Sequence, residues 1–582
     1  MEIKRGIPVS PGVAIGPALV LDTEWFRIPK RSVDAKRLGE EVQRLREALA
    51  DAAREARANE QAVTDKLGRQ YGAIFGAHAL LIEDPTLCRE VETLVRDQGY
   101  AAEYAVSRVM RRHAKTLESL NSGILAARAA DLFDIEKRIL RRLLGQRREQ
   151  LQHLSESVIV LAHDLSPSET AALDPHMVHA FATEAGGRAS HTAIMAGALE
   201  IPAVVGLGKF VTDVSGGDMV IVDGNRGVLI LNPDDETLER YENTRRGFVT
   251  FESRLGELRD LPGVTRDGAR VMLLGNIEFP EEAAHCLQRG ADGVGLYRTE
   301  FLYLGRHSDP TESEHLDACL TVMRTLGANR PVVIRTLDVG ADKFATSNEP
   351  PAEERNPFLG LRSVRLCLRN LTLFKTQMRA ILRASAFGDV RIMFPMVSTL
   401  MELRQCKMIL AEVKEDLEEE GIAFNPKLPV GTMIEVPSAA ILAEQLAREV
   451  NFFSIGTNDL TQYTLAADRT NETVATLYNP GDPAVLRLIK LVVDAASKQR
   501  IDVNVCGEMS GEPIYTMLLL GMGLRQLSVT PHNIPEIKKI IRSVSLEEAA
   551  RVAEEALRIE SGRDVNNFLR EQTRRILPEV VG

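Results

Sequence analysis

One histidine lies in a stretch well suited to phosphoryl chemistry. An apolar run, Val178 to Thr183, leads into the string EAGGRASHT at residues 184–192. Paired glycines let the backbone turn sharply and approach a ligand closely. Ser190 is a natural N-cap, so we expect His191 at a helix start, where unpaired N–H groups and the positive helix end favour an anion. A neutral imidazole is a competent nucleophile near pH 7, so the string predicts a histidine that accepts a phosphoryl group.

The alternative for His191 is a histidine that begins a helix and takes no part in chemistry. That explanation normally holds for a single histidine. The combination Gly-Gly-Arg-x-Ser-His-Thr is specific enough to favour the catalytic interpretation.

The C-terminal half repeats short apolar runs, each followed by a stretch with helical periodicity. The runs expected to form strands are 271–277, 293–299, 332–338, 391–397, 430–436, 452–459, 503–509 and 524–530. Eight β/α units over about 300 residues predict a closed parallel (β/α)8 barrel of the TIM type. Such barrels place their chemistry at the carboxyl ends of the strands.

Polar residues gather at these predicted strand ends. They are Asn276, Arg298, Glu300, Arg335, Asp338, Glu435, Asn458, Asp459, Cys506 and Glu508. The segments between the strands add Asp342, Lys343, Arg362, Arg365 and Arg469. Any one of these residues could equally belong to a structural ion pair. Together they predict an anionic ligand, because arginine forks match phosphate and carboxylate oxygens.

Two further features of this rim point to a metal ion and to proton transfer. Glu435 and Asp459 follow adjacent strands, and Mg²⁺ typically takes one or two protein carboxylates together with substrate phosphate oxygens. Most buried cysteines are inert. The position of Cys506 on the rim nevertheless makes it a candidate proton donor.

The remaining elements predict how these residues are held. Residues 1–22 form short strands that must pair with later ones, and 34–152 carries apolar residues at helical spacing, typical of a bundle of antiparallel hairpins. We therefore expect a multidomain α/β chain. Its parts are an α/β domain with the phosphohistidine (1–33 and 146–231), an α-helical insert (34–145), a charged helical linker (232–261) and the barrel (262–582).

Composition excludes several other classes of function. The net charge of −11 argues against nucleic-acid binding. The six cysteines are scattered without metal-ligand spacing, which indicates reduced thiols in the cytoplasm. No signal peptide is expected, and no apolar run reaches the roughly 18 residues of a membrane span.

Three motifs resemble those of the phosphoenolpyruvate-utilising enzymes. They are GGRASHT at 186–192, IGTNDLTQY at 455–463 and VCGE at 505–508. Within that superfamily the chain looks most like the Enzyme I family of the sugar phosphotransferase system. Length, domain order and the segment SPGVAIG at 10–16 agree with that family, so the resemblance covers essentially the whole chain.

The resemblance implies a set of residue roles. By position, the phosphorylated histidine is His191, the proton donor is Cys506, and the substrate-binding residues are Arg298, Arg335, Arg362, Asn458 and Arg469. The Mg²⁺ carboxylates would be Glu435 and Asp459. The family's activity passes a phosphoryl group from phosphoenolpyruvate (PEP) to a histidine-phosphocarrier protein (HPr). The helical insert would dock this carrier, and the barrel would form a homodimer.

Two alternatives remain open at this point. A nucleotide-using relative, such as PEP synthase or pyruvate phosphate dikinase, would need an ATP-binding domain, and no Gly-rich phosphate loop is present. A non-catalytic regulator would be expected to lose His191, Cys506 or the carboxylate pair. The chain departs from the family pattern at Ala189, where Thr is frequent, and at Gly197, where Arg is common, so the phosphohistidine could be stabilised somewhat differently.

Overall fold

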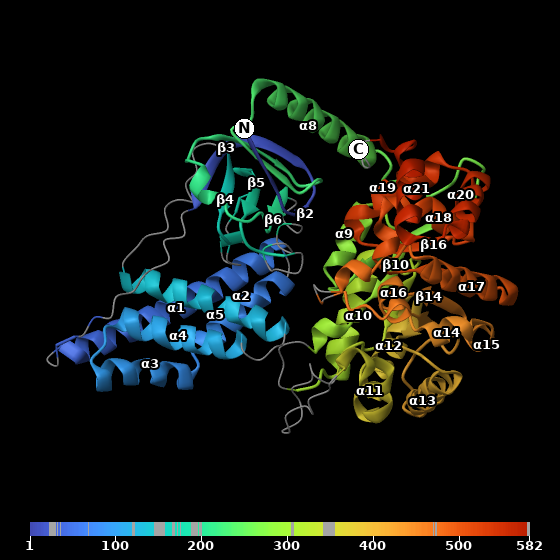
Figure 1. Cartoon of the computed structure of the whole chain (residues 1–582). Coiled ribbons are helices and arrows are strands. Elements are labelled where there is room, and N and C mark those ends of the chain that lie inside the picture. Colours follow the sequence, from blue (N-terminus) through green and yellow to red (C-terminus); the bar gives the residue numbers. More distant parts are fainter. Residues whose placement is uncertain are drawn as a thin grey trace. The chain divides into compact units, whose positions relative to one another are not determined.

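The computed structural model describes most of the chain. The described residues are 1–21, 31, 33–34, 37–67, 69–118, 123–144, 157–165, 169–170, 173–174, 176–187, 192, 196, 201–303, 308–340, 356–469, 471 and 474–578. They belong to two compact units, Met1–Thr250 and Phe251–Gly582, each of which is described by itself (Figure 1). Asp342 and Lys343 lie outside the described residues, as do Arg188 to His191.

A mixed sheet forms the centre of the first unit. Within the described part of the chain its strands run in the order β1-β8-β7-β3-β4-β5-β6-β2. Their bounds are β1 Glu2–Arg5, β2 Ile7–Ser10, β3 Val13–Leu21, β4 Val158–Ala162, β5 Val178–Thr183, β6 Ala203–Val205, β7 Met219–Asp223 and β8 Val228–Leu231. The strands from β3 to β6 are parallel neighbours, and the other pairs are antiparallel.

The register of this sheet confirms that the first strands pair with much later ones. Ala18 of β3 lies opposite Ile159 of β4, and Glu2 of β1 lies opposite Leu231 of β8. Both faces of β4 are buried, since Ile159 packs into one apolar cluster and Val160 into another. The short strand β6 was missed by the sequence analysis.

Helices connect β3 to β4, as the apolar spacing predicts. Their bounds are α1 Leu38–Leu67, α2 Arg69–Ile82, α3 Pro85–Gln98, α4 Ala102–Glu118 and α5 Gly123–Leu144. Leu45, Leu49, Ile135 and Ile139 lie in their shared apolar core, and α1 packs against α2 as α4 does against α5. After β8 the chain continues into α8, Asp235–Gly256, so the predicted linker is helical.

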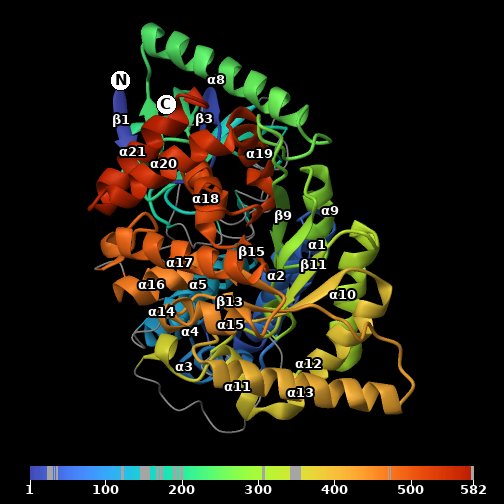
Figure 2. The ribbon, with the colours of Figure 1, turned by 90° about the vertical axis from the view of Figure 1, so that its right-hand side faces the viewer.

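The second unit is the predicted barrel. Among the described residues, eight strands close in the order β9 to β16, and every neighbouring pair is parallel. Their bounds are β9 Met272–Ile277, β10 Gly293–Tyr297, β11 Val332–Arg335, β12 Val390–Phe394, β13 Val430–Ile434, β14 Phe452–Ile455, β15 Asp502–Val505 and β16 Gln526–Val529. Helices surround the strands (Figure 2).

The helices of this unit follow their strands in the chain. Their bounds are α9 Glu282–Gln288, α10 Glu312–Leu326, α11 Ser363–Arg369, α12 Leu371–Ala384, α13 Leu400–Glu419, α14 Pro437–Ile441, α15 Ala443–Ala447, α16 Thr457–Leu465, α17 Pro483–Gln499, α18 Thr516–Met522, α19 Ile534–Ser543, α20 Leu546–Arg558 and α21 Gly562–Arg574. Across the described residues of the whole chain, no helix has both the length and the hydropathy required to cross a membrane.

The barrel strands end earlier than the sequence predicts. β14 stops at Ile455, so Asn458 and Asp459 lie in the first turn of α16 and not in a strand. Likewise, β10 stops at Tyr297, before Arg298. Continued pairing in the sheet would point alternate residues into the barrel. Because the chain leaves the sheet at these positions, its polar side chains lie at the rim.

Candidate active site

A chain of ion pairs links three of the predicted residues at the barrel rim. Arg335, at the end of β11, places Nη1 2.8 Å from Oδ2 of Asp338, and Asp338 places Oδ1 3.0 Å from Nη2 of Arg362. Glu300 holds the other side of Arg335 at 3.2 Å. All four side chains are largely buried, and the two guanidinium groups keep the pKa of Asp338 below its ordinary value despite burial.

Glu435 lies beside this series of ion pairs and is almost fully buried. Its Oε1 accepts a hydrogen bond from the backbone N–H of Met396 at 2.6 Å. Met396 reaches this position with a positive φ of 53°, a conformation that costs free energy for a non-glycine residue. Burial, together with the negative charges of Asp338 and Asp459, raises the pKa of Glu435 to about 8. Three carboxylates therefore share a small region that favours a cation.

Asn458 and Arg469 meet at Glu508, on the exposed edge of the same rim. The Asn458 side chain donates to Glu508 Oε1 at 3.1 Å and accepts from the Glu508 backbone N–H at 2.9 Å. Arg469 Nη1 lies 3.6 Å from Glu508 Oε1. Glu508 is 69% exposed, so this contact with Arg469 is solvent-screened and can exchange for another anion at small cost.

Cys506 lies at the base of the mouth and is 3% exposed. Its Sγ lies 3.2 Å from the hydroxyl of Ser454, and it packs among apolar side chains that point into the barrel. Burial raises the pKa of the thiol to about 11. The charges of Glu435, Arg335 and Arg298 also act on that pKa, which places the thiol within electrostatic reach of the charged rim.

Arg298 follows β10 and forms an ion pair with Glu278. Its Nε is buried and has no hydrogen-bond partner within the described residues. The Nε of Arg335 is also buried and has no hydrogen-bond partner in the described part of the chain. Buried donors of this kind are normally satisfied, so both arginines have capacity for a bound anion.

Two glycines of the predicted motifs permit close contacts at this rim. A Cβ on Gly456 would lie 2.8 Å from Glu435 Oε2, and a Cβ on Gly507 would lie 1.9 Å from Oγ1 of Thr457. Both values are far below ordinary contact distances. Glycine is therefore required for the packing that brings β13, β14 and β15 together beneath the site.

His191 lies outside the described residues, but the start of its segment is described. Glu184 follows β5; its Oε1 accepts from the backbone N–H groups of Phe210 and Val211, at 2.7 and 2.8 Å. Its Oε2 lies 2.7 Å from Nδ1 of His163. Gly186 then turns the chain with a φ of 110°. These contacts fix the position of Glu184, the first residue of the segment that leads to His191.

The structure brings most of the predicted rim residues into one site. Arg335, Asp338, Arg362, Glu435 and Asp459 form one connected group, and Arg362 Nη2 lies 3.8 Å from Asp459 Oδ2. Asn458, Arg469 and Glu508 form a second group, joined to the first through the first turn of α16. Arg365 instead contacts Leu359 and Glu402 on the outer side, so it belongs to the scaffold.

Sequence reasoning missed two positioning contributions. The backbone of Met396 carries no signal in the sequence, because its role depends on a strained φ. Ser454 lies directly before the motif at 455–463 and was identifiable only by its place in β14.

The chain was compared with known protein families. It matches the PEP-utilising enzyme models for the N-terminal domain at residues 5–128, the mobile domain at 154–227 and the PEP-binding domain at 252–546. The chain belongs to the PEP-utilising enzyme family. All the rim residues above lie within the PEP-binding domain, and His191 lies within the mobile domain of that family.

Curated members of the family are similar over nearly the full length. Phosphoenolpyruvate-protein phosphotransferase of Geobacillus stearothermophilus is 44% identical over 566 residues, covering 97% of each chain. The protein with the same name from Bacillus subtilis is 41% identical over 571 residues, covering 98% of this chain and 100% of its own. That of Staphylococcus carnosus is 41% identical over 573 residues, covering 98% and 99%.

Proposed function

We propose that the chain is a phosphoenolpyruvate–protein phosphotransferase that carries the phosphoryl group on His191 and delivers it to a histidine-phosphocarrier protein. The observation that carries this proposal is the rim itself, where Arg335, Arg362 and a buried protonated thiol meet at the mouth of a closed barrel. The full-length similarity to named phosphotransferases agrees with this assignment. It favours neither a non-catalytic regulator nor a nucleotide-using relative.

The substrate carries a phosphate and a carboxylate, and the rim offers cationic groups for both. Arg298 and Arg335 each keep a buried Nε–H available, and the ion-pair partner of Arg469 is an exposed carboxylate. Arg362 and Asn458 complete the proposed binding set. Guanidinium groups held by buried carboxylates stay in place during the reaction, so they stabilise charge on the transferring group without reorganisation.

The residues present fit a magnesium ion. No group of three or more His, Cys, Asp or Glu among the described residues is arranged to hold a metal alone. Mg²⁺ commonly takes only one or two protein carboxylates and completes its shell with water and substrate phosphate. Glu435 and Asp459 would supply them; burial is the main cause that raises the pKa of Glu435, and the negative charges of Asp338 and Asp459 add to it. Bound there, the ion would neutralise charge on the phosphoryl oxygens.

The first half-reaction transfers phosphorus to nitrogen. A nitrogen lone pair of the neutral His191 imidazole attacks phosphorus in line, an N–P bond forms, and the P–O bond to the enol oxygen breaks. The released enolate takes a proton at its methylene carbon. The thiol of Cys506 donates this proton, because its raised pKa keeps it protonated at neutral pH. Pyruvate leaves, and Arg335 stabilises the thiolate until it regains a proton from solvent.

The nucleophile and the substrate site lie in different parts of the chain. His191 lies between β5 and β6 of the first unit, whereas the rim residues lie in the second. We propose that the first domain swivels about the helical linker, which spans residues 232–261, to alternate between the rim and the carrier protein. The domain boundaries predicted from the sequence (1–33 and 146–231, 34–145, 232–261 and 262–582) are part of this proposal.

Two exposed apolar surfaces support the proposed partners. Leu80, on α2 of the helical insert, is 69% exposed, and we assign this helix to carrier docking. On the barrel, Met401 and Met408 of α13 and Ile441 of α14 are 61%, 58% and 65% exposed. We propose that these exposed apolar side chains contribute to the homodimer interface. All six cysteines are free thiols, which is typical of a protein in the cytoplasm.

The decisive experiment is incorporation of ³²P from labelled PEP with Mg²⁺. We expect label that is acid-labile and base-stable, passes to HPr, and is absent from His191→Ala. The matched control is His176→Ala, an exposed histidine of the same domain, which should label normally. Labelling from ATP would indicate a dikinase instead. If neither PEP nor ATP labels the protein, the barrel binds its ligand without phosphoryl transfer, and the non-catalytic regulator would be favoured.

A further inference from the structure

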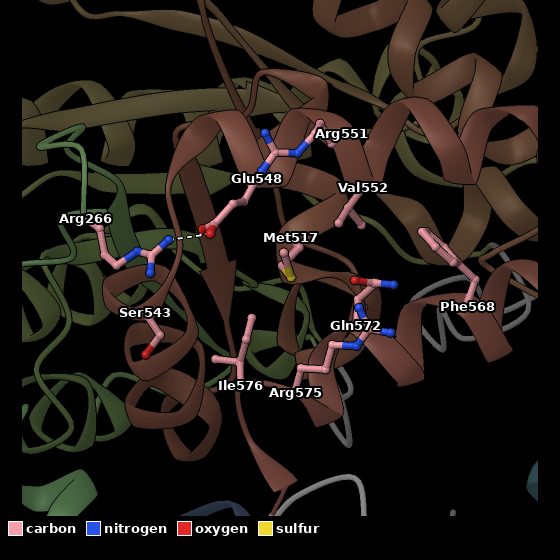
Figure 3. Close-up of a pocket in the computed structure, with 10 residues that line it drawn as sticks. All are labelled: Arg266, Met517, Ser543, Glu548, Arg551, Val552, Phe568, Gln572, Arg575 and Ile576. Atoms are coloured by element: carbon pink, nitrogen blue, oxygen red, sulfur yellow. Dashed lines mark hydrogen bonds and ion pairs between the residues drawn. The ribbon is translucent and has the colours of Figure 1, made fainter.

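A cavity lies in the second unit at the end of the barrel opposite the proposed catalytic rim. Its volume is about 520 Å³. Arg266 precedes β9, and Ser543 ends α19, so both lie at the amino-terminal end of the strands. Figure 3 shows the residues that line the cavity. Small-molecule sites typically measure roughly 300–1,000 Å³. The proposed phosphotransfer makes no use of this cavity.

The floor of the cavity is apolar. Met517 and Val552 are 5% and 7% exposed, and Phe568 and Ile576 pack against the barrel core while remaining partly open. These side chains come from α18, α20, α21 and the segment after α21 (Figure 3). The helices are fixed there, because Gly521 of α18 packs so closely on α20 that a Cβ would lie 2.0 Å from a backbone oxygen.

The rim of the cavity is cationic. Arg266, Arg551 and Arg575 line it together with a single carboxylate, Glu548. Both oxygens of that carboxylate already have partners, since Arg266 pairs with Oε1 and the backbone N–H of Ser545 donates to Oε2 at 2.9 Å. The positive charges of Arg551 and Arg575 are therefore not balanced by any carboxylate of the cavity lining.

Both remaining arginines are held only weakly. Arg551 contacts Glu547, four residues earlier on α20, through Nη1 alone, at 2.7 Å. Arg575 contacts one oxygen of Glu571 at 3.3 and 3.4 Å. All four side chains are more than half exposed, and such pairs contribute little. The guanidinium groups can therefore take a ligand without losing a strong contact. In Figure 3 they lie on opposite sides of Met517.

We propose that this cavity binds a small organic anion with an apolar body, whose ring or branched alkyl group covers Met517 and Val552. Its carboxylate or phosphate binds the guanidinium group of Arg551 or that of Arg575, each of which can match such oxygens bidentately. PEP lacks an apolar body of this size, and its proposed site lies at the other end of the barrel. The inference is independent of the proposed catalytic roles.

The test uses the full chain and a fluorescent aromatic sulfonate, 8-anilinonaphthalene-1-sulfonate, with PEP and Mg²⁺ present throughout to occupy the catalytic rim. We expect one saturable site per chain, displaced by phenyl phosphate and phenylacetate but not by neutral phenylacetamide. The double variant Arg551→Gln/Arg575→Gln should weaken binding roughly tenfold or more, because charge-assisted hydrogen bonds are lost. Arg558→Gln is the matched control, on the same helix and outside the cavity.

Three results with phenylacetamide, the double variant and the Arg558→Gln control would overturn the proposal. They are displacement by phenylacetamide as effective as by phenylacetate, affinity unchanged in the double variant, and equal weakening in the Arg558→Gln control. Thermal unfolding of each variant shows whether it folds. A second variant, Val552→Trp, fills the apolar floor and should abolish binding while leaving both arginines in place. Retained affinity in a folded Val552→Trp chain would place the probe elsewhere.

Discussion

Tyr463 of α16 donates its hydroxyl to the carbonyl oxygen of Phe358 at 2.5 Å, across more than a hundred residues of sequence. The same hydroxyl accepts from Nη1 of Arg362 at 3.4 Å. One side chain therefore links the segment that contains Phe358 to α16, whose first turn contains Asn458 and Asp459. Burial raises the pKa of Tyr463 to about 12, so the hydroxyl remains a donor over the working pH range.

Tyr463→Phe should weaken PEP binding more than it slows turnover. Arg362 loses a hydrogen-bond partner and the Phe358 carbonyl loses its donor, while the ion pair between Arg362 and Asp338 remains. We expect KM for PEP to rise roughly tenfold and kcat to change little. Tyr515→Phe is the matched control, since it removes a hydrogen bond to Asn566 away from the rim. Equal kinetics for the two variants would contradict this role.

Glu184→Ala should destabilise the first unit and slow phosphorylation of His191. The substitution leaves the N–H groups of Phe210 and Val211 without their acceptor, which costs about 1–3 kcal/mol for a buried group. Thermal unfolding and ³²P labelling measure the two effects. Glu239→Ala, on the exposed side of α8, serves as control and should change neither.

The stabilising effect of Glu184 should depend on pH in a defined direction. Burial raises the pKa of this carboxyl, but the hydrogen bonds from His163, Val211 and Phe210 outweigh burial and hold it below its ordinary value of 4.5. The stabilisation is therefore present above that value and is lost as the pH falls through the lower pKa of the folded state. Wild type and Glu184→Ala should approach one another in stability below pH 4.5. A constant difference down to pH 3 would contradict this.

Cys506→Ala should separate phosphorylation from pyruvate formation. The thiol is the proposed general acid, and loss of such a group lowers rates by roughly 10²- to 10⁴-fold. Pyruvate release should fall by that factor, while PEP binding should change little. Because burial raises the pKa of the thiol to about 11, the wild-type rate should show no ionisation of this group below about pH 10. Cys319→Ala, buried within α10, is the control for loss of a buried thiol.

Gly507→Ala should disturb the rim by steric conflict alone. The backbone φ of Gly507 is −76°, which any residue adopts, but the new Cβ would lie 1.9 Å from Thr457 Oγ1 and 2.7 Å from its backbone nitrogen. Asn458 and Asp459 directly follow Thr457 in α16 and would move with Thr457. We expect a loss of about 1–3 kcal/mol in stability and a larger loss of activity. Gly216→Ala, where the new Cβ meets nothing, should be neutral.

The sequence alone predicts the barrel well because its strands are buried on both faces. Runs such as Val430 to Ile434 contain no charged residue and stand out against charged helices. Strand ends are less predictable. The residues around Ile455 do not show that the backbone turns into α16 at Gly456, where the side chain of Glu435 leaves no room for a Cβ.

The rim residues were predicted from motifs and strand ends, whereas the contacts between them were not. Arg335 and Asp338 were recognisable at a predicted strand end. The contact between Tyr463 and Phe358, and the strained N–H of Met396, arise only when separate loops meet in space. The length of the short strand β6, Ala203–Val205, is below what a periodic pattern can indicate.

The insertion of helices α1 to α5 between two adjacent parallel strands has a consequence during synthesis. β3 pairs with β4, and β1 with β8, so the first strands wait for partners translated about 140 and 230 residues later. At roughly 5–20 residues per second, that wait lasts on the order of ten seconds or more. The helices α1 to α5 need only near neighbours and can fold meanwhile on the ribosome. The nascent chain thus carries unpaired strand edges next to a finished bundle, which makes this interval the one most exposed to aggregation.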